Sequence, residues 1–368
     1  MTIGILQEPS PETRVSLLPD AAATLTKQNI TVQLEKNAGA LAYASDESYQ
    51  SKNINIVDRS VVLNTSNIIL FIQPLSKDDV QHLKANTILI GVYQPLFNSE
   101  LMQQWAAKNI TVFSLDMMPR TTRAQAMDVL SSQSNIAGYK AVLEAANIYP
   151  RYFPMFMTAA GSITPAKVLI LGAGVAGLQA VATARRLGAV VEVFDTRPAV
   201  KEEVMSLGAK FIEVEGAADA SKAGGYAVDQ TEDYKQKQQQ RIADAIAKAD
   251  IVITTAQIPG KKAPILITDE MLKAMKAGSV IIDLAASTGG NTLQTKKNQT
   301  IQYNGVTIVG NSNLAATMPG DASKLYGKNV LNFLQLIISK DGNINLNFAD
   351  DIVAGCCVVH DGIVRIRI

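Results

Sequence analysis

The fold is decided by a stretch that reads Lys167-Val168-Leu169-Ile170-Leu171-Gly172-Ala173-Gly174-Val175-Ala176-Gly177-Leu178-Gln179-Ala180. A short apolar run ends at a glycine and is followed by helix-forming residues, which predicts a strand, a glycine turn and a helix. Gly172 permits the sharp turn, Gly174 lets backbone amides approach a pyrophosphate, and Gly177 lets the helix lie close to the strand. The unpaired N–H groups of the first helical turn would then face a phosphate.

A second apolar run, residues 189–194, ends at Asp195, about 20 residues after the glycines. An acidic residue at that distance accepts hydrogen bonds from the hydroxyls of an adenosine ribose. A GxGxxG pattern by itself is weak evidence, because glycine turns also serve packing in many α/β proteins. With Asp195 in place, the pattern predicts a dinucleotide site and leaves a packing turn as the alternative.

Strands and helices alternate along the sequence, which predicts an α/β protein with two Rossmann-like, doubly wound parallel sheets joined by long helices. The first array of predicted strands comprises residues 2–6, 30–34, 67–72, 87–92 and 110–113, and includes a helix over 99–108 with Ser99 as its N-cap. The second array comprises residues 168–171, 190–194, 210–214, 251–254, 280–284 and 306–309.

A predicted helix over residues 121–148 connects the two arrays, and a helix over 322–339 leads back to the first. We therefore expect a discontinuous N-terminal domain, residues 1–125 plus 322–368, and a dinucleotide-binding domain, residues 126–321. Residues 216–240 are rich in small and then charged residues, which indicates an exposed loop leading into a helix over 234–249. Tyr226, directly after Gly224 and Gly225, makes this loop either a lid over the site or a solvated insertion.

The composition is that of a globular protein, with 47% hydrophobic and 18% charged residues among 368. Its length exceeds what one core usually serves, which favours two domains. The net charge of +1 gives no reason to expect nucleic acid or an anionic membrane as a partner. We expect no secretory signal in residues 1–9 and no membrane span in the apolar residues 168–184, and therefore a cytoplasmic protein.

No metal site is expected. Cys356 and Cys357 are adjacent, which suits neither a disulfide nor a metal-ligand spacing, so they are interpreted as reduced apolar residues. His82 and His360 have no ligand pattern near them and are interpreted as surface residues.

Several motifs together resemble the NAD(H)-binding component, domain I, of proton-translocating nicotinamide nucleotide transhydrogenases, which are relatives of alanine dehydrogenases. The resemblance covers essentially the whole chain, and its most specific segment is the run from Met118 to Asn135, which is similar to the family's Arg–Gln–Asp loop. The other matching motifs, in order, are Glu12-Thr13-Arg14-Val15, the glycine turn with Asp195-Thr196-Arg197, Gly224-Gly225-Tyr226, residues 254–260 and residues 282–285.

The resemblance implies that Arg120, Asp128 and Ser131 hold the nicotinamide end of NAD(H) and that Gln125 reaches toward the partner nucleotide. An arginine fork, an amide, a carboxylate and a hydroxyl suit a carboxamide and ribose hydroxyls, although each alone is equally compatible with an ordinary hydrogen bond or ion pair. The remaining implied cofactor-binding residues are Thr121, Thr122, all six residues of the glycine turn (Gly172, Ala173, Gly174, Val175, Ala176 and Gly177), Asp195, Thr196, Arg197, Gly225, Tyr226, Gln238 and Gln257.

The choice between NAD(H) and NADP(H) depends on Asp195, whose charge would repel a 2′-phosphate and so favours NAD(H). Arg197 is a complication, because an arginine near that strand end accepts a 2′-phosphate in other proteins. Its alternative interpretation is a surface cation close to the pyrophosphate. We expect NAD(H) here, with NADP(H) bound on a partner component.

The sequence also discriminates between the two relatives. An amino-acid dehydrogenase moves a proton as well as a hydride and needs a titratable group beside the nicotinamide. In alanine dehydrogenases a lysine and a histidine stand where this chain has Phe71 and Gln94, and neither of these titrates. Arg14, which would match a substrate-binding arginine, is interpreted as an ion-pair partner of Glu12. The chain also departs from the transhydrogenase pattern, at Phe71 and at Ala286-Ser287-Thr288.

The resemblance therefore implies an oxidoreductase that passes hydride between NADH and NADP⁺ held on a partner, coupled to proton translocation by a membrane component. It further implies a homodimer, an NADP(H)-binding β subunit, a membrane-spanning partner and a peripheral position on the inner membrane. The alternatives are an alanine or other amino-acid dehydrogenase and a non-catalytic NAD-sensing module.

Overall fold

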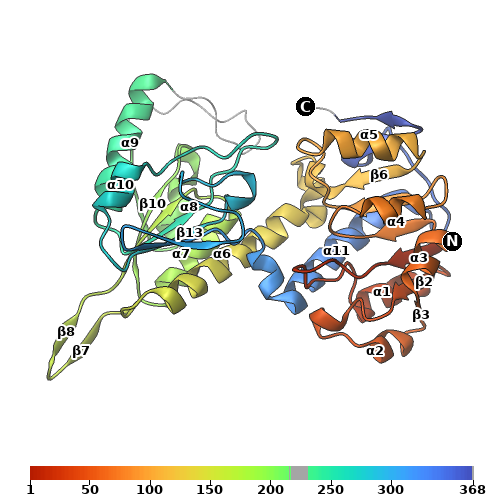
Figure 1. Cartoon of the computed structure of the whole chain (residues 1–368), viewed down its shortest axis with the longest axis horizontal. Helices are drawn as coiled ribbons and strands as arrows, with labels where there is room; N and C mark the ends of the chain where they lie inside the picture. The colour runs from red at the N-terminus through yellow and green to blue at the C-terminus, as the bar shows by residue number, and fades with distance from the viewer. Residues whose placement is uncertain (215, 217–230, 367–368) are drawn as a thin grey trace. The chain divides into compact units, whose positions relative to one another are not determined.

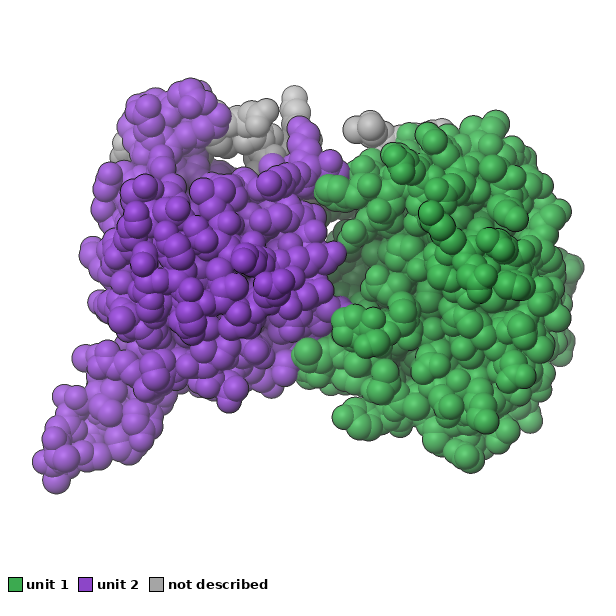
Figure 2. All heavy atoms as spheres, viewed as in Figure 1, with its two compact units in different colours: residues 1–133, 316–368 green, residues 134–315 purple. Residues whose placement is uncertain are grey.

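The computed structural model describes residues 1–214, 216 and 231–366. The chain divides into two compact units, unit 1 with residues 1–133 and 316–368 and unit 2 with residues 134–315 (Figure 2). Each unit contains its own sheet and its own hydrophobic cores.

Unit 1 is built on an eight-stranded sheet in the order β17-β16-β6-β5-β4-β1-β2-β3. Its six parallel strands are β1 (Thr2–Ile5), β2 (Thr31–Glu35), β3 (Asn55–Val57), β4 (Ile68–Leu70), β5 (Ile88–Gly91) and β6 (Thr111–Ser114). The strands β16 (Cys357–His360) and β17 (Ile363–Val364) extend the sheet by antiparallel pairing. The five predicted strands are confirmed, whereas the short β3 and the C-terminal hairpin were not predicted.

The sheet of unit 1 is buried on both faces, as parallel strands require. Ile68 and Leu70 of β4 pack on the side of the long helix α11, while Ile69 between them packs on the side of α5 with Trp105. The helices are α1 (Pro19–Thr26), α2 (Asp46–Gln50), α3 (Arg59–Thr65), α4 (Lys77–Gln81), α5 (Ser99–Ala107), α11 (Pro319–Ile337), α12 (Asp351–Cys356) and the 3₁₀ turns η1 (Ala40–Ala42) and η2 (Leu115–Met117). The predicted capping role of Ser99 is wrong, since Asn98 occupies the N-cap position and makes no side-chain cap.

The predicted helix over 121–148 is divided in the structure. A 3₁₀ helix, η3 (Thr122–Met127), comes first, and the α-helix α6 (Val129–Ile148) starts after Asp128. Asp128 has an extended backbone, with φ −75° and ψ 94°, so the first helix cannot continue through it. The break therefore separates a short loop segment from the helix that continues into unit 2.

Unit 2 contains a seven-stranded sheet in the order β11-β10-β9-β12-β13-β15-β14. The parallel strands are β9 (Lys167–Leu171), β10 (Val190–Phe194), β11 (Lys210–Phe211), β12 (Ile251–Thr254), β13 (Val280–Asp283) and β15 (Val306–Val309). All six predicted strands are present, although β11 is only two residues long, and the antiparallel edge strand β14 (Thr300–Tyr303) was not predicted. The strand order reverses at β9, and sheets of this kind bind ligands at such a reversal, outside the carboxyl ends of the strands.

The helices of unit 2 cover both faces of this sheet (Figure 1). At Gly138 of α6, an added Cβ would overlap the carbonyl group of Ala176, so glycine is required where α6 approaches α7. The elements are α7 (Val175–Arg186), α8 (Lys201–Ser206), α9 (Glu232–Ile246), α10 (Asp269–Ala274), the 3₁₀ turns η4 (Pro198–Val200) and η5 (Ala286–Thr288), and η6 (Leu314–Thr317) at the boundary with unit 1.

A two-stranded hairpin, β7 (Phe156–Thr158) with β8 (Gly161–Ile163), projects from the body of unit 2 (Figure 1). Its apolar side chains are exposed, 65% for Met155 and 73% for Met157. The ring of Phe156 stacks on Tyr152, with centroids 5.5 Å apart. The hairpin was not predicted, because its polar and apolar residues do not alternate over a length that identifies a strand.

Candidate functional site

The glycine turn lies at the carboxyl end of β9, at the reversal of strand order in unit 2. Gly172 has φ +108°, a conformation that side chains rarely adopt. A Cβ at Gly177 would overlap the carbonyl oxygen of Gly172, whereas a Cβ at Gly174 would meet no atom of the described residues within 4 Å. Gly177 therefore serves close packing, and the space beside Gly174 is clear of the residues that the structure describes.

The first turn of α7 is suited to an anion. Gly174 is the N-cap and offers no side chain to the N–H groups of Val175 and the residues after it. Such N–H groups, together with the positive end of the helix dipole, favour a phosphate. The residues at this turn thus fit the pyrophosphate of a dinucleotide.

Asp195 follows β10 and is tied to the turn. Its Oδ2 accepts a hydrogen bond from the backbone N–H of Ala173 at 2.7 Å. Its Oδ1 and Oδ2 also accept bonds from the Nε of Arg197, at 2.9 Å, and from its Nη2, at 2.8 Å. The carboxylate holds the pKa of Arg197 above its ordinary value.

Arg197 is therefore a partly exposed cation that is paired with Asp195. Its side chain is 20% exposed and forms a two-point ion pair with Asp195. This pairing offsets the negative charge of Asp195, on which the preference for NAD(H) depends. Thr196 lies between the two residues and is half-buried.

Two other predicted residues of unit 2 lie after strand β12 and on helix α9. Gln257 follows β12, is exposed, and donates from Nε2 to the carbonyl oxygen of Leu284 at 2.9 Å. Gln238 is half-buried on α9, one turn beyond Tyr234. Gly225 and Tyr226 lie outside the described residues, and so does most of the predicted lid.

Tyr234 is a further candidate that was not predicted. It is buried in the first turn of α9, and burial, followed by the nearby charge of Asp195, raises its pKa. In the sequence Tyr234 is a single aromatic residue at the start of a glutamine-rich helix, and this pattern does not mark it as part of a site.

The predicted nicotinamide-binding residues lie in unit 1, on the loop of residues 120–131, here called the 120–131 loop. Arg120, Thr121, Thr122 and Gln125 are exposed. Asp128 and Ser131 are in contact, because the Asp128 carboxylate accepts from the backbone N of Ser131 at 2.9 Å and from its Oγ at 2.6 Å. The structure thus groups the predicted residues in two sets, one in each unit.

The predicted ion pair of Arg14 with Glu12 is confirmed. Both side chains are buried, with Arg14 Nη2 2.6 Å from Glu12 Oε2 and Arg14 Nε 2.8 Å from Glu12 Oε1. Arg14 Nη1 also donates to Gln133 Oε1 at 2.8 Å. Phe71 is a core residue under Arg59, and Gln94 is exposed.

Glu8 is a titratable residue that was not considered in the sequence. It is buried beyond the end of β1, and its oxygens accept from the backbone N–H groups of Ile72, at 2.6 Å, and Gln73, at 3.1 Å. Burial is the main cause that raises its pKa to about 8. Only the fold shows this burial, since Glu8 stands in a polar stretch of the sequence.

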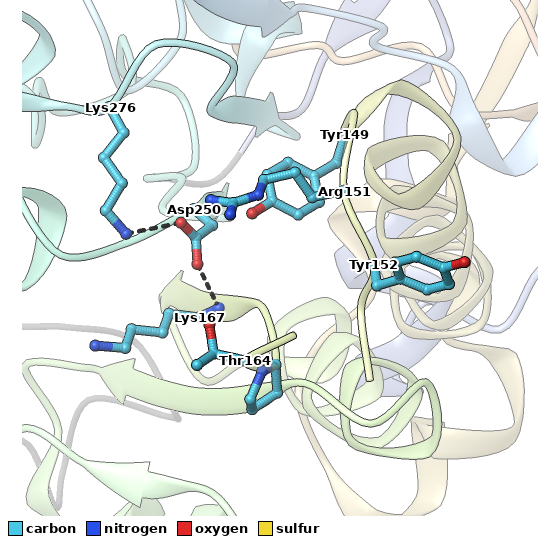
Figure 3. Close-up of a pocket in the computed structure, with 8 residues that line it drawn as sticks. Tyr149, Arg151, Tyr152, Thr164, Lys167, Asp250 and Lys276 are labelled. Carbon is cyan, nitrogen blue, oxygen red and sulfur yellow. Dashed lines mark hydrogen bonds and ion pairs between the residues drawn. The ribbon is translucent and has the colours of Figure 1, made fainter. Parts of the chain in front are cut away.

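A cavity of about 200 Å³ lies at the opposite edge of the unit 2 sheet, before the first residues of β9, β12 and β13 (Figure 3). Asp250 at its centre accepts from the backbone N of Lys167 at 2.9 Å and pairs with Lys276 Nζ at 2.8 Å. Ligands of such sheets bind outside the carboxyl ends of the strands. This cavity is therefore separate from the candidate nucleotide site.

Two observations concern metals and membranes. Over residues 1–214, 216 and 231–366, no group of three or more His, Cys, Asp or Glu side chains is placed to hold a metal ion. Cys356 and Cys357 are buried free thiols, and His360 is half-buried beside Phe348 rather than at the surface. Within the same ranges no helix combines the length and the hydropathy that a membrane span needs, and residues 168–184 form β9 and α7.

Comparison with protein-family models identifies the family of this chain. The family model for the alanine dehydrogenase/PNT N-terminal domain matches residues 4–137, and that for the alanine dehydrogenase/PNT C-terminal domain matches residues 141–367. The chain belongs to the alanine dehydrogenase/PNT family. The resemblance inferred from the motifs is thereby confirmed.

Within the alanine dehydrogenase/PNT family, the chain is more similar to transhydrogenases than to alanine dehydrogenases. It is 43% identical over 365 residues to the first section of the NAD(P) transhydrogenase subunit alpha of Rickettsia prowazekii (strain Madrid E), covering 98% of this chain and 94% of that one. The crystal structure of a transhydrogenase from Sinorhizobium meliloti matches with a TM-score of 0.90 at 41% identity, covering 99% of this chain and all of the other. An alanine dehydrogenase of Staphylococcus haemolyticus (strain JCSC1435) is 27% identical over 351 residues, covering 92% of this chain and 88% of that one.

Proposed function

We propose that this chain is the NAD(H)-binding component of a proton-translocating NAD(P) transhydrogenase. It would pass hydride between NADH and NADP⁺ bound on a partner, and a membrane component would couple the transfer to proton translocation. The observation that carries the proposal is the similarity over nearly the full chain to a transhydrogenase alpha subunit. The glycine turn at the strand reversal supports it, because its geometry suits a dinucleotide.

The proposed cofactor-binding residues occur in both units. We propose that unit 1 is the N-terminal domain and that unit 2 is the NAD(H)-binding domain. In unit 2, the N–H groups of residues 172–177 hold the pyrophosphate and Asp195 receives the adenosine ribose, with Thr196, Arg197, Gln238 and Gln257 beside them. In unit 1, Arg120, Asp128 and Ser131, assisted by Thr121 and Thr122, orient the nicotinamide end, and Gln125 faces the partner nucleotide. Gly225 and Tyr226 stay in the proposal as closing residues.

The chemistry needs orientation rather than acid–base catalysis. NAD(H), when bound, supplies or receives the hydride, and the protein orients the ring and excludes water. Neither Phe71 nor Gln94 titrates, so neither can act as a general acid or base. The absence of a proton-transferring residue at these two positions suits a transfer between two nicotinamides.

An amino-acid dehydrogenase is the weaker alternative. Its substrate carboxylate would need the guanidinium of Arg14, but Glu12 engages this group at two points and Gln133 at a third. The pair is buried, so releasing Arg14 would break an ion pair inside unit 1, which is strongly destabilising.

We also propose the assembly that the resemblance implies: a homodimer, associated with an NADP(H)-binding β subunit and through a membrane-spanning partner with the inner face of the membrane. The β7–β8 hairpin supports the homodimer. Phe156 and Met157 are 46% and 73% exposed on an arm that projects from unit 2. Exposed apolar groups of this kind are typical of protein–protein contacts.

The test is an assay of NADH oxidation with an NADP⁺ analogue and a separately supplied NADP(H)-binding component, run in parallel with pyruvate and ammonia. We expect turnover only in the first arm. Turnover on pyruvate and ammonia would overturn the proposal, and nucleotide binding without turnover in either arm would favour the sensing module. Sedimentation of the chain alone, and of a Met157→Asp variant, tests the dimer.

A further inference from the structure

The backbone of the 120–131 loop is held by two side chains of α11. The carbonyl oxygen of Ala126 accepts a hydrogen bond from Asn329 Nδ2 and another from Asn332 Nδ2, both at 2.9 Å. Asn329 and Asn332 are three residues apart and so lie on one face of α11. Because a carbonyl oxygen has two lone pairs, the two amides use its full capacity. We call this arrangement the asparagine clamp.

Neither helix formation nor core packing accounts for these asparagines. Asparagine is a poorer helix former than alanine, leucine or glutamine, and both residues stand inside a long helix. Asn329 is only 7% exposed, and within the described part of the chain its Oδ1 has no hydrogen-bond partner. Burying an unpaired acceptor is unfavourable. The contact that explains Asn329 is its bond to Ala126.

The clamp holds the loop next to its exposed polar residues. Ala126 directly follows Gln125 and lies within η3. Asp128, two residues after Ala126, is the C-cap of η3. On either side of Ala126, the side chains of Ala124 and Met127 are buried in the core of unit 1. The backbone between Gln125 and Asp128 is therefore fixed from inside, while the side chain of Gln125 is exposed.

A second attachment holds the start of the loop. Arg123 pairs with Asp350, with Nη1 2.6 Å from Oδ2 and Nη2 2.9 Å from Oδ1, and also contacts Asp351. Asp350 caps α12 with bonds to the N–H groups of Ile352 and Val353. The Arg123 side chain is half exposed, so its ion pairs contribute less than the bond from the buried Asn329.

We propose that Asn329 and Asn332 are positioning residues for hydride transfer. They touch no nucleotide and act through the backbone of Ala126, which sets where Gln125 and Asp128 present their side chains. The proposal rests on the transhydrogenase function proposed above. A displacement of about 1 Å in such a site costs up to about 10²-fold in rate, so a clamp of this kind affects turnover more than binding.

The test compares Asn332→Ala, Asn329→Ala and the double variant in the complete chain with the NADP(H)-binding component and an NADP⁺ analogue. Gln335→Ala is the matched control, because Gln335 is an exposed amide residue on the same helix. We expect the double variant to transfer hydride about tenfold more slowly or worse, with NADH affinity changed by less than about threefold. Asn332→Gln, which keeps the donor, should restore part of the rate, and Asn332→Asp, which removes it, should not.

A double-mutant cycle identifies the route of the effect. If Asn332 acts through Gln125, then Asn332→Ala adds little to the loss caused by Gln125→Ala. Additive effects both in this cycle and in the same cycle with Asp128→Asn would overturn the clamp, and so would a double variant that behaves like Gln335→Ala. If the double variant does not fold, the hydride-transfer rate of Asn332→Ala alone tests the clamp, because Asn332 is only half-buried.

Failure of the clamp differs from failure of the proposed function. If Arg120→Ala and Gln125→Ala slow hydride transfer but the asparagine variants do not, the function stands and the clamp is wrong. If Arg120→Ala and Gln125→Ala leave transfer unchanged, the 120–131 loop is not in the reaction site, and the clamp is overturned with it.

Discussion

Asp128 receives two hydrogen bonds from Ser131, one from its backbone N–H at 2.9 Å and one from its hydroxyl at 2.6 Å. Asp128 directly precedes α6, and Ser131 is the third residue of that helix. The bond to the N–H is the geometry of a helix N-cap. Two of the proposed nicotinamide-binding residues are therefore also the start of the helix that continues into unit 2.

This double role predicts that Asp128 variants separate stability from binding. Asp128→Ala removes the cap and should lower the free energy of unfolding by about 1 kcal/mol. Asp128→Asn keeps a capping oxygen and should unfold nearly as the parent does, yet bind NADH more weakly if the carboxylate contacts the nucleotide. Chemical denaturation and a fluorescence titration with NADH measure the two effects. An unchanged NADH affinity in Asp128→Asn would mean that the Asp128 carboxylate only caps the helix and does not contact the nucleotide.

The glycine turn predicts opposite results for two similar substitutions. A Cβ at Gly177 would overlap the Gly172 carbonyl oxygen, so Gly177→Ala should destabilise unit 2 by about 1–3 kcal/mol. A Cβ at Gly174 meets no atom in the described part of the chain, and its backbone, with φ −78°, suits alanine, so Gly174→Ala should fold normally. Its methyl group would instead occupy the space beside the pyrophosphate, and NADH affinity should fall by about tenfold. Normal NADH binding by Gly174→Ala would contradict the site.

The Asp195–Arg197 pair predicts a change in nucleotide preference. Arg197→Ala removes the cation that offsets Asp195, so the affinity ratio of NADH over NADPH should rise by about tenfold, or about 1.4 kcal/mol. Asp195→Asn should lower the same ratio. Parallel titrations with NADH and NADPH give the ratios, and Lys201→Ala, which breaks an exposed pair with Glu213, serves as the control. A ratio that falls in Arg197→Ala would show that Arg197 does not act by neutralising Asp195.

Glu8 predicts a pH dependence of stability. Its pKa is about 8 in the folded chain and 4.5 ordinarily, so between these values the folded state holds a proton that the unfolded state has lost. The free energy of unfolding should therefore fall as the pH rises through this window, by about 1.4 kcal/mol per pH unit from this group, and level off above pH 8. Urea titrations at pH 5, 6, 7 and 8 would show a shallower slope for Glu8→Gln, which has no proton to lose. Parallel slopes for the two proteins would mean that Glu8 is ionised in the fold.

Much of the fold was predictable because each buried parallel strand is a short apolar run that ends at a turn. β4 and β12 are examples: every residue of both is buried, and both were predicted from the sequence. β3, β14 and the β7–β8 hairpin were missed, since they are short or lie at edges and carry polar and apolar residues together. The helix break at Asp128 was missed because helix propensity describes residues inside a helix. It gives no weight to the hydrogen bonds by which the Asp128 carboxylate caps α6.

The glycine turn, the alternation of strands and helices and the family follow from the order of residues alone. The turn is largely a local matter, since Gly172 adopts φ +108° and a Cβ at Gly177 would overlap the carbonyl oxygen of Gly172. How the charges and amides pair became clear only in the folded chain. Arg197 is joined to Asp195, Glu8 is buried against Ile72, and Asn329 and Asn332 reach Ala126, some 200 positions away in the chain. The pKa, the charge balance and the rigidity of a side chain depend on the neighbours that folding brings to it, and most of these neighbours are distant in sequence.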